Sequence, residues 1–305
     1  MLVNKSTLAA IFVNLKATFN QAFSEAPTTW QKIAMKVPST TGQEDYAWLS
    51  NFPRMRRWIG DKAVRSLAAF RYSVVNDDFE ATVEVDRNHI EDDQLGIYKP
   101  MAQGAGFAAK QWPDELVAEV VNGAFTTPCY DGQYFCDTDH PVGDGNGGTI
   151  TVSNRTTAAL DISTLALAQA SYGAARAAMM QFKDDEGRPL GIIPNVLLVG
   201  PALMDTANAL VSVDRLEDGK PNPYKGTAEV VVDTRITSAT AWFLLDTTKP
   251  VKPFIFQERK APVFVQQTDP QADDVFMRRK FKFGAEARGA SGYGFWQLCY
   301  GSTGA

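Results

Sequence analysis

Between residues 79 and 121 the pattern of hydrophobic positions changes its period once. Over 79–86, Phe79, Ala81, Val83 and Val85 alternate with polar residues. Successive side chains of a β-strand point to opposite faces, so this period of two predicts a half-buried strand. From 95 to 121 the apolar residues recur every three or four positions, which predicts one face of a long helix. That face consists of Tyr98, Met101, Ala105, Ala108, Trp112, Leu116 and Val120.

A helix over 95–121 would span roughly 40 Å at about 1.5 Å per residue. Pro100 and Pro113 lie within it, so we expect a kinked or broken rod. A rod that runs from one edge of a subunit to the other is typical of proteins built for assembly. An ordinary amphipathic core helix is the alternative.

Residues 1–25 carry a second helical pattern. Leu8, Ile11, Leu15, Phe19 and Phe23 recur on one face. The segment has no small-residue cleavage site, so we expect an amphipathic helix rather than a signal peptide. It precedes a polar, turn-rich stretch and is therefore either a detachable arm or a helix packed on its own subunit.

A β-hairpin is predicted just before the long helix. Residues 70–74 alternate in polarity, the turn residues 76–78 follow, and the alternating run 79–85 comes next. Asp86 is then placed to cap a short helical turn over 87–90.

The second half of the chain contains two regions with different patterns of predicted secondary structure. Residues 157–248 alternate helical and strand patterns, which predicts a mixed α/β domain inserted in the chain. Its expected elements are a helix at 160–182, a strand at 195–200, a helix from Pro201 to about 210, and strands at 229–233 and 241–245. Beyond residue 249 the pattern is all β, with short strands expected at 254–256, 263–265, 275–277 and 281–283. The fold class is therefore α+β.

Residues 48–65 interleave aromatic and basic side chains. Aromatic residues and arginine are enriched at protein interfaces, so this stretch predicts an inter-subunit contact. A solvated basic face or the stacking of nucleic-acid bases are the alternatives. The acidic run Glu91, Asp92 and Asp93 offers a protein surface of opposite charge. The expected contact residues on the basic side are Trp48, Arg54, Arg56, Arg57, Trp58 and Arg65.

Composition excludes several classes of function. The 305 residues are 45% hydrophobic, enough for a large core, and the net charge of −5 argues against a dedicated nucleic-acid binder. No run of eighteen or more apolar residues is present, so we expect no membrane span. Three cysteines, odd in number and without a pattern, fit reduced thiols in a cytoplasm rather than a disulfide framework.

Reactive residue types are densest at 128–141. Cys129, Cys136, Asp137, Asp139 and His140 could form a zinc site or a Cys–His nucleophile pair. A zinc site of known spacing needs a second ligand pair nearby, and a catalytic cysteine needs an oriented base; the spacing supplies neither. We therefore favour a structured loop in which aspartates cap turns. No Rossmann, G-x-S-x-G or H-E-x-x-H motif is present, and the Gly-rich run 143–148 lacks the ending of a phosphate loop. We expect no catalytic, cofactor or metal site.

Several dispersed segments, which together span nearly the full length, carry a family resemblance. They are KIAMKVPST (32–40), YAWLSNFPRMRRWIG (46–60), FEATVEVDRNHIEDDQLGIYKP (79–100), PDELVAEVVNGAFTTPCYDGQYFCDTDHPV (113–142), KPFIFQERKAPVF (252–264) and FMRRKFKFGAEARGASGYGFWQ (276–297). In this order they resemble the Mu-like bacteriophage major head subunits, which are tailed-phage major capsid proteins of the HK97-like fold.

The resemblance implies a shell subunit with separate parts. An N-terminal arm would occupy 1–44 and an extended β-hairpin loop 45–85. A peripheral domain would take 86–156 and 249–305, with a spine helix at 93–122, and an axial domain would take 157–248. Copies would form the hexamers and pentamers of an icosahedral virion capsid around double-stranded DNA, which it would contact without sequence specificity.

The implied partners are further copies of the chain, a scaffolding protein, a portal and possibly a decoration protein, with assembly in the cytoplasm of a bacterial host and no role for a membrane. An encapsulin-like nanocompartment shell is the alternative with the same fold. A cytoplasmic Cys/His enzyme or zinc protein is the alternative of another class.

Overall fold

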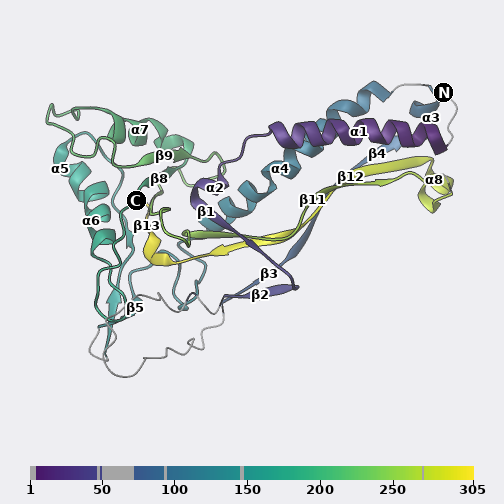
Figure 1. Cartoon of the computed structure of the whole chain (residues 1–305). Helices are drawn as coiled ribbons and strands as arrows, with labels where there is room; N and C mark the ends of the chain where they lie inside the picture. The colour runs from purple at the N-terminus through teal and green to yellow at the C-terminus, as the bar shows by residue number, and fades with distance from the viewer. Residues whose placement is uncertain (1–4, 47–48, 50–71, 93–94, 145–147, 270) are drawn as a thin grey trace.

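The computed structural model describes residues 5–46, 49, 72–92, 95–144, 148–269 and 271–305. Two sheets dominate it (Figure 1). The first has the order β1-β11-β12-β4 and consists of Ala34–Pro38, Phe254–Gln267, Lys280–Tyr293 and Asp77–Asp86. The second has the order β7-β13-β10-β8-β9 and consists of Arg155–Thr156, Cys299–Ser302, Trp242–Leu245, Val196–Val199 and Glu229–Val232.

The long hairpin β11–β12 extends away from the second sheet (Figure 1). Its antiparallel pairing runs from Phe254↔Tyr293 to Gln267↔Lys282, with two irregularities on the way. The short helix α8, Asp273–Arg278, lies at the end of the hairpin, where the sequence pattern predicted a strand over 275–277. The strand prediction was wrong because an apolar run of three residues is compatible with either a strand or a helix. Here these residues form a helical turn in the connection between the two long strands.

The N-terminal helix α1, Lys5–Glu25, lies along α4, Lys99–Asn122, and both cover the hairpin half of the molecule (Figure 1). Leu8, Ile11, Leu15 and Phe19 of α1 are buried, as the helical pattern predicted, and Phe23 is half-buried. Phe12, which lies outside the predicted stripe, is buried as well. The helices approach closely at Gly106, where a Cβ would clash with the backbone carbonyl oxygen of Phe19. In this structure α1 therefore packs on its own chain.

The buried face of α4 agrees with the predicted one only in part: Tyr98, Ala105 and Trp112 are buried as predicted. Met101 is 51% exposed and Ala108 is exposed, whereas Ala102, Gly106 and Ala109 are buried. The helix contacts α1 and the first sheet together, so small residues between the large apolar ones form much of its buried surface. A search for large apolar residues at helical spacing does not find such a face.

The two prolines do not divide α4. Pro100 lies in its first turn, where the missing N–H would have no intrahelical partner, and Pro113 lies inside one continuous helix. The expectation that Pro100 interrupts the rod is wrong, because the helix begins only at Lys99, after a 3-10 turn at Leu95–Tyr98.

The hairpin predicted over 70–85 is also wrong. β3, Ser73–Val75, pairs with β2, Gln43–Asp45, and β4 pairs with β12 instead of with β3. Asn76 makes no hairpin turn; its buried amide donates to Ser39 Oγ at 2.8 Å and accepts from Gln257 Nε2 at 2.7 Å. The turn chemistry of Asn76 thus serves a tertiary contact.

The second sheet contains the most completely buried strands of the fold. Every residue of β8 and β10 is buried, and both strands lie where the sequence predicted strands. β13 from the C-terminal end lies between β7 and β10, so the sheet of the 157–248 block also includes residues assigned by sequence to the closing strands.

Helices surround this sheet. They are α5 at Leu165–Ala168, a π-helical turn at Gln169–Gly173, α6 at Ala174–Gln181 and, after a 3-10 turn at Pro201–Leu203, α7 at Met204–Ser212. The helix predicted from residue 160 begins at Leu165, because Thr164 caps it by accepting from the Leu167 N–H.

Five short elements complete the described structure: α2 at Trp30–Ile33, α3 at Arg87–Glu91, the paired strands β5 at His140–Gly143 and β6 at Thr149–Val152, and a 3-10 turn at Trp296–Leu298. Asp86 caps α3 as predicted, its carboxylate accepting from the Asn88 N–H at 2.8 Å. A helix that could span a bilayer is not found in the described ranges.

Candidate functional site

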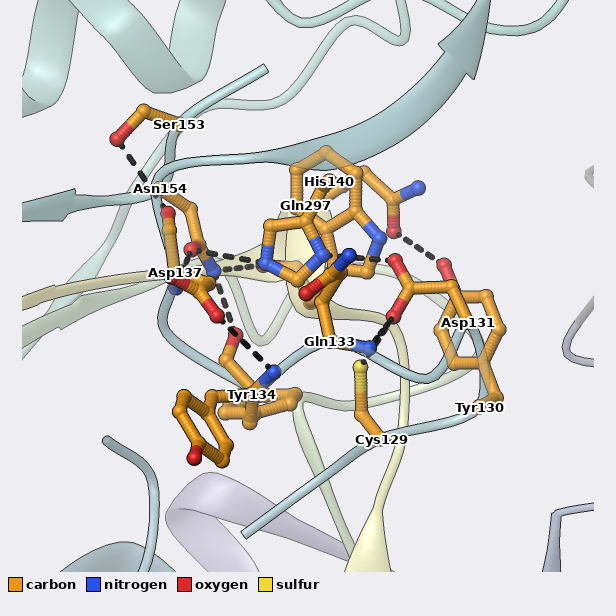
Figure 2. Close-up of polar contacts among 12 residues, drawn as sticks. Cys129, Tyr130, Asp131, Gln133, Tyr134, Asp137, His140, Ser153, Asn154 and Gln297 are labelled. Atoms are coloured by element: carbon orange, nitrogen blue, oxygen red, sulfur yellow. Dashed lines mark hydrogen bonds and ion pairs between the residues drawn. The ribbon is translucent and has the colours of Figure 1, made fainter. Parts of the chain in front are cut away.

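The loop that follows α4 gathers the reactive side chains singled out by the sequence. The backbone turns at Cys129–Gln133, where the Cys129 N–H donates to the Gln133 carbonyl at 2.7 Å. Gly132 has φ of +88°, a left-handed conformation that suits glycine, and so closes this turn. The turn places Cys129 and Asp131 beside His140 at the start of β5 (Figure 2).

Asp131 lies between the thiol and the imidazole. Its Oδ1 accepts from the Cys129 thiol at 3.1 Å and from the Gln133 N–H at 3.1 Å. Its Oδ2 lies 2.7 Å from Nδ1 of His140. Sequence reasoning singled out Cys129 and His140 but missed Asp131, because its position between two turn residues is also that of an ordinary loop aspartate.

Asn154 holds the other side of the imidazole. Its Oδ1 lies 3.1 Å from Nε2 of His140 and accepts from the Asp137 N–H at 2.8 Å. Its Nδ2 donates to three backbone carbonyls, those of Phe135, Trp296 and Cys299. These contacts fix which end of the amide faces His140, and the His140 ring stacks on Trp296 with centroids 4.0 Å apart.

The electrostatics of the cluster argue against a nucleophilic cysteine. Burial and then the charge of Asp131 raise the pKa of the Cys129 thiol far above its ordinary value. Burial acts to raise the pKa of Asp131 as well, but the hydrogen bonds from His140 and Cys129 outweigh it and lower that pKa. A thiolate nucleophile needs an adjacent base. Here the imidazole contacts the carboxylate and not the thiol.

The other candidates in this loop have structural contacts. Cys136 is fully buried with its Sγ 3.8 Å from Sγ of Cys299, which the sequence places far away. Asp137 caps its turn as expected, accepting from the Tyr134 and Thr138 N–H groups. The expectation of a structured loop is thus confirmed at these positions.

The predicted contact residues are mostly beyond what the structure describes. Trp48, Arg54, Arg56, Arg57, Trp58, Arg65 and Asp93 lie outside the described residues. Of the acidic run, Glu91 ends α3 and Asp92 follows it with an exposed side chain. β2 and β3 pair on either side of residues 46–72, so the basic and aromatic stretch lies in the connection between two paired strands.

A different exposed surface was not predicted. Phe276 is 81% exposed and Met277 76% exposed, on α8 at the end of the β11–β12 hairpin. Two neighbouring large apolar side chains thus lie in water at the end of the hairpin, whereas Val275 of the same helix is buried in a cluster with Phe281 and Phe283 of β12. We name Phe276 and Met277 the hairpin tip.

Comparisons with known proteins agree on one family. The model of a family described as Mu-like prophage major head subunit gpT matches residues 8–164, 161–236 and 233–305. The Mu-like prophage FluMu major head subunit of Haemophilus influenzae is 33% identical over 304 residues, covering 99% of this chain and 75% of the relative. The major capsid protein of Escherichia phage Mu is 32% identical over 298 residues, covering 98% of this chain and 74% of the relative.

Solved structures show the same likeness. The procapsid of bacteriophage JBD30 contains a chain with a TM-score of 0.64 and 31% identity, with coverage of 98% of this chain and 76% of that one. A JBD30 capsid decorated with minor capsid protein trimers gives a TM-score of 0.60 and 30% identity, with coverage of 72% of this chain and 93% of that one.

Proposed function

The chain belongs to the family of Mu-like prophage major head subunits, and we propose which part of the subunit makes which contact in the assembled shell. The chain is the major capsid protein of a Mu-like phage, a structural protein of the virion that forms an icosahedral capsid and not an enzyme. The α+β fold is that of the HK97-like phage capsid proteins. Neither a nanocompartment shell nor a Cys/His enzyme is supported by these relatives.

The shell is built, in this proposal, from hexamers and pentamers of the chain. Residues 157–248, which contain β8, β9, β10 and their helices, form an axial domain at the centre of each capsomer. Residues 86–156 and 249–305, which contain α4 and the hairpin β11–β12, form a peripheral domain. Residues 1–44 form an arm, and its strand β1 pairs with β11 of the peripheral domain. The hairpin tip is the observation that carries the proposal: Phe276 and Met277 are 81% and 76% exposed, which a subunit acting alone has no reason to maintain.

Assembly then depends on many weak contacts that symmetry repeats. The tip buries apolar surface against neighbouring copies. A scaffolding protein, a portal and a decoration protein are the further partners, and double-stranded DNA is packaged without specific contacts, in keeping with the net charge of −5. The JBD30 capsid with its minor capsid protein trimers supports a decoration partner.

Expression of the chain, alone and with its scaffolding protein, followed by negative-stain electron microscopy, tests this proposal. We expect closed or tubular particles. Monomers under all assembly conditions, with folding verified by circular dichroism, would contradict it.

A second contact is proposed for the extended loop of 45–85, in the part that precedes β4, which reaches a neighbouring subunit. Its basic and aromatic residues would meet the acidic run of that neighbour, of which Asp92 is exposed. The paired strands β2 and β3 support this proposal because they hold both ends of the intervening segment together.

Charge reversal tests the loop contact. Arg56→Glu or Arg57→Glu should lower the yield of particles in sedimentation and leave the circular dichroism spectrum unchanged. Lys16→Glu, at an exposed position of α1, is the matched control for the change in charge. Restoration of assembly by Asp92→Arg in the Arg56→Glu background would identify the acidic partner, whereas equal loss of folding and assembly would reject the interface role.

A further inference from the structure

The imidazole of His140 faces a hydrogen-bond acceptor at each of its nitrogens. Nδ1 lies 2.7 Å from a carboxylate oxygen of Asp131, and Nε2 lies 3.1 Å from the amide oxygen of Asn154. Asn154 cannot be turned around, because its Nδ2 already donates to three carbonyls and its Oδ1 accepts from the Asp137 N–H. A neutral imidazole carries one N–H, which can satisfy only one of these acceptors.

Each neutral tautomer leaves one lone pair of the ring facing an acceptor. If Nε2 donates to Asn154, the lone pair of Nδ1 points at a carboxylate, and two acceptors face each other at 2.7 Å. A second ring proton removes this conflict, and so does a cation bound to Nδ1 and the carboxylate once the two groups move apart to admit it. His140 is fully buried and the Asp131 side chain is 8% exposed, so the conflict cannot be relieved by bulk water.

The third member of the cluster favours a metal ion. Sγ of Cys129 lies 3.1 Å from the other oxygen of Asp131, and the ligand atoms of Cys129, Asp131 and His140 all lie within 4.8 Å of one another. With a ring proton, His140 and Asp131 are satisfied and the Cys129 thiol remains a neutral hydrogen-bond donor to Oδ1 of Asp131. A divalent cation would engage all three groups.

We propose that Cys129, Asp131 and His140 bind a Zn²⁺ ion. Thiolate, imidazole and carboxylate are the donors that zinc takes in proteins. Asn154 supplies the expected support, because a histidine that binds a metal usually donates its other N–H to a neighbouring acceptor. Three protein ligands leave one position for water.

The ion would have a structural role. It would join the turn after α4 to β5, and through Asn154 to the backbone of Trp296 and Cys299 beside β13. Binding releases the thiol proton of Cys129 and any proton held between His140 and Asp131, so affinity should rise with pH. An ion that binds only the folded chain stabilises it.

Metal analysis of the full-length protein tests the proposal. The purified chain is stripped with a chelator, loaded with Zn²⁺ and dialysed against metal-free buffer. We expect one zinc per chain, and a lower melting temperature for the stripped protein than for the loaded protein. In Co²⁺-loaded protein we expect thiolate charge-transfer bands and the visible absorption of a tetrahedral site.

Matched variants separate a specific site from adventitious binding. Cys129→Ser and Asp131→Asn should lose the zinc and the cobalt spectrum. Cys136→Ser, a buried cysteine outside the cluster, should keep both. Wild-type protein that retains no zinc and gives no cobalt thiolate bands would overturn the proposal, as would nuclear magnetic resonance spectra that show protons on both His140 nitrogens in the zinc-loaded protein. These results do not depend on capsid assembly.

Discussion

The strand β11 begins in one environment and ends in another. Its first four residues, from Phe254 to Gln257, are buried, whereas the residues after them are half-buried or exposed. β8 and β10, in contrast, are buried at every position. The second sheet and the start of β11 thus belong to one large hydrophobic core, while the outer part of the hairpin is a thin layer that α1 and α4 cover. This difference indicates that the second sheet contributes more to the free energy of folding, and that the outer part of the hairpin offers surface for contacts with neighbouring subunits.

The largest effect on stability should come from the second sheet. Leu244 is fully buried in β10, so Leu244→Ala should lower the free energy of unfolding by about 2–5 kcal/mol, since it removes apolar contacts and leaves a cavity. Val263→Ala, at a position 40% exposed on the outer part of β11, is the comparison. Urea unfolding of unassembled subunits measures both. Equal losses would remove the distinction between the two regions.

The packing of α1 on α4 should be next in size. Gly106→Ala places a methyl group against the Phe19 carbonyl oxygen and should destabilise the chain by about 1–3 kcal/mol. Gly104→Ala is the control on the same helix, because open space surrounds that position, and it should stabilise by about 0.5–1 kcal/mol. Thermal unfolding gives the sign of each change. A stabilising Gly106→Ala would mean that α1 does not lie against α4.

Acid should destabilise the loop after α6 through Asp184. Burial acts to raise the pKa of Asp184, but hydrogen bonds from the Arg188 and Glu186 N–H groups and from the Arg188 side chain outweigh it and lower that pKa below its ordinary value of 3.8. A lowered pKa contributes stability above pH 3.8 that is lost as pH falls through the pKa of the folded state.

Asp184→Asn should therefore cost about 1–3 kcal/mol at neutral pH and reduce the loss of stability in acid. Glu217→Gln, at an exposed position of the same block, is the control and should leave both unchanged. Urea unfolding across the acid range provides the measurement. An unchanged acid dependence in the variant would show that Asp184 does not contribute.

Substitutions at the hairpin tip should have the smallest effect on stability and a large effect on assembly. Phe276→Ser and Met277→Ser change exposed side chains, so the free energy of unfolding should move by no more than about 0.5 kcal/mol. Particle yield, measured by sedimentation and electron microscopy, should fall strongly. Normal particles from the double variant would show that the hairpin tip is not a contact between subunits.

The sequence by itself determined the features that depend on local pattern. The apolar runs of β8 and β10, the stripe of α1, the cap at Asp86 and the α+β class follow from periodicity and turn chemistry, because burial of an apolar face is a local requirement. The dispersed family segments identified the capsid family from residue order alone.

Only the tertiary structure determined how the strands pair and which side chains come into contact. Asn76 has the chemistry of a turn, yet Ser39 and Gln257 use its amide, so β3 pairs with β2. The buried face of α4 is set by α1 and the sheet on either side of it, and Asp131 meets His140 only because Gly132 turns the chain. Contacts between residues far apart in sequence leave no period along the chain, and the free energy of packing that selects them depends on the assembled fold.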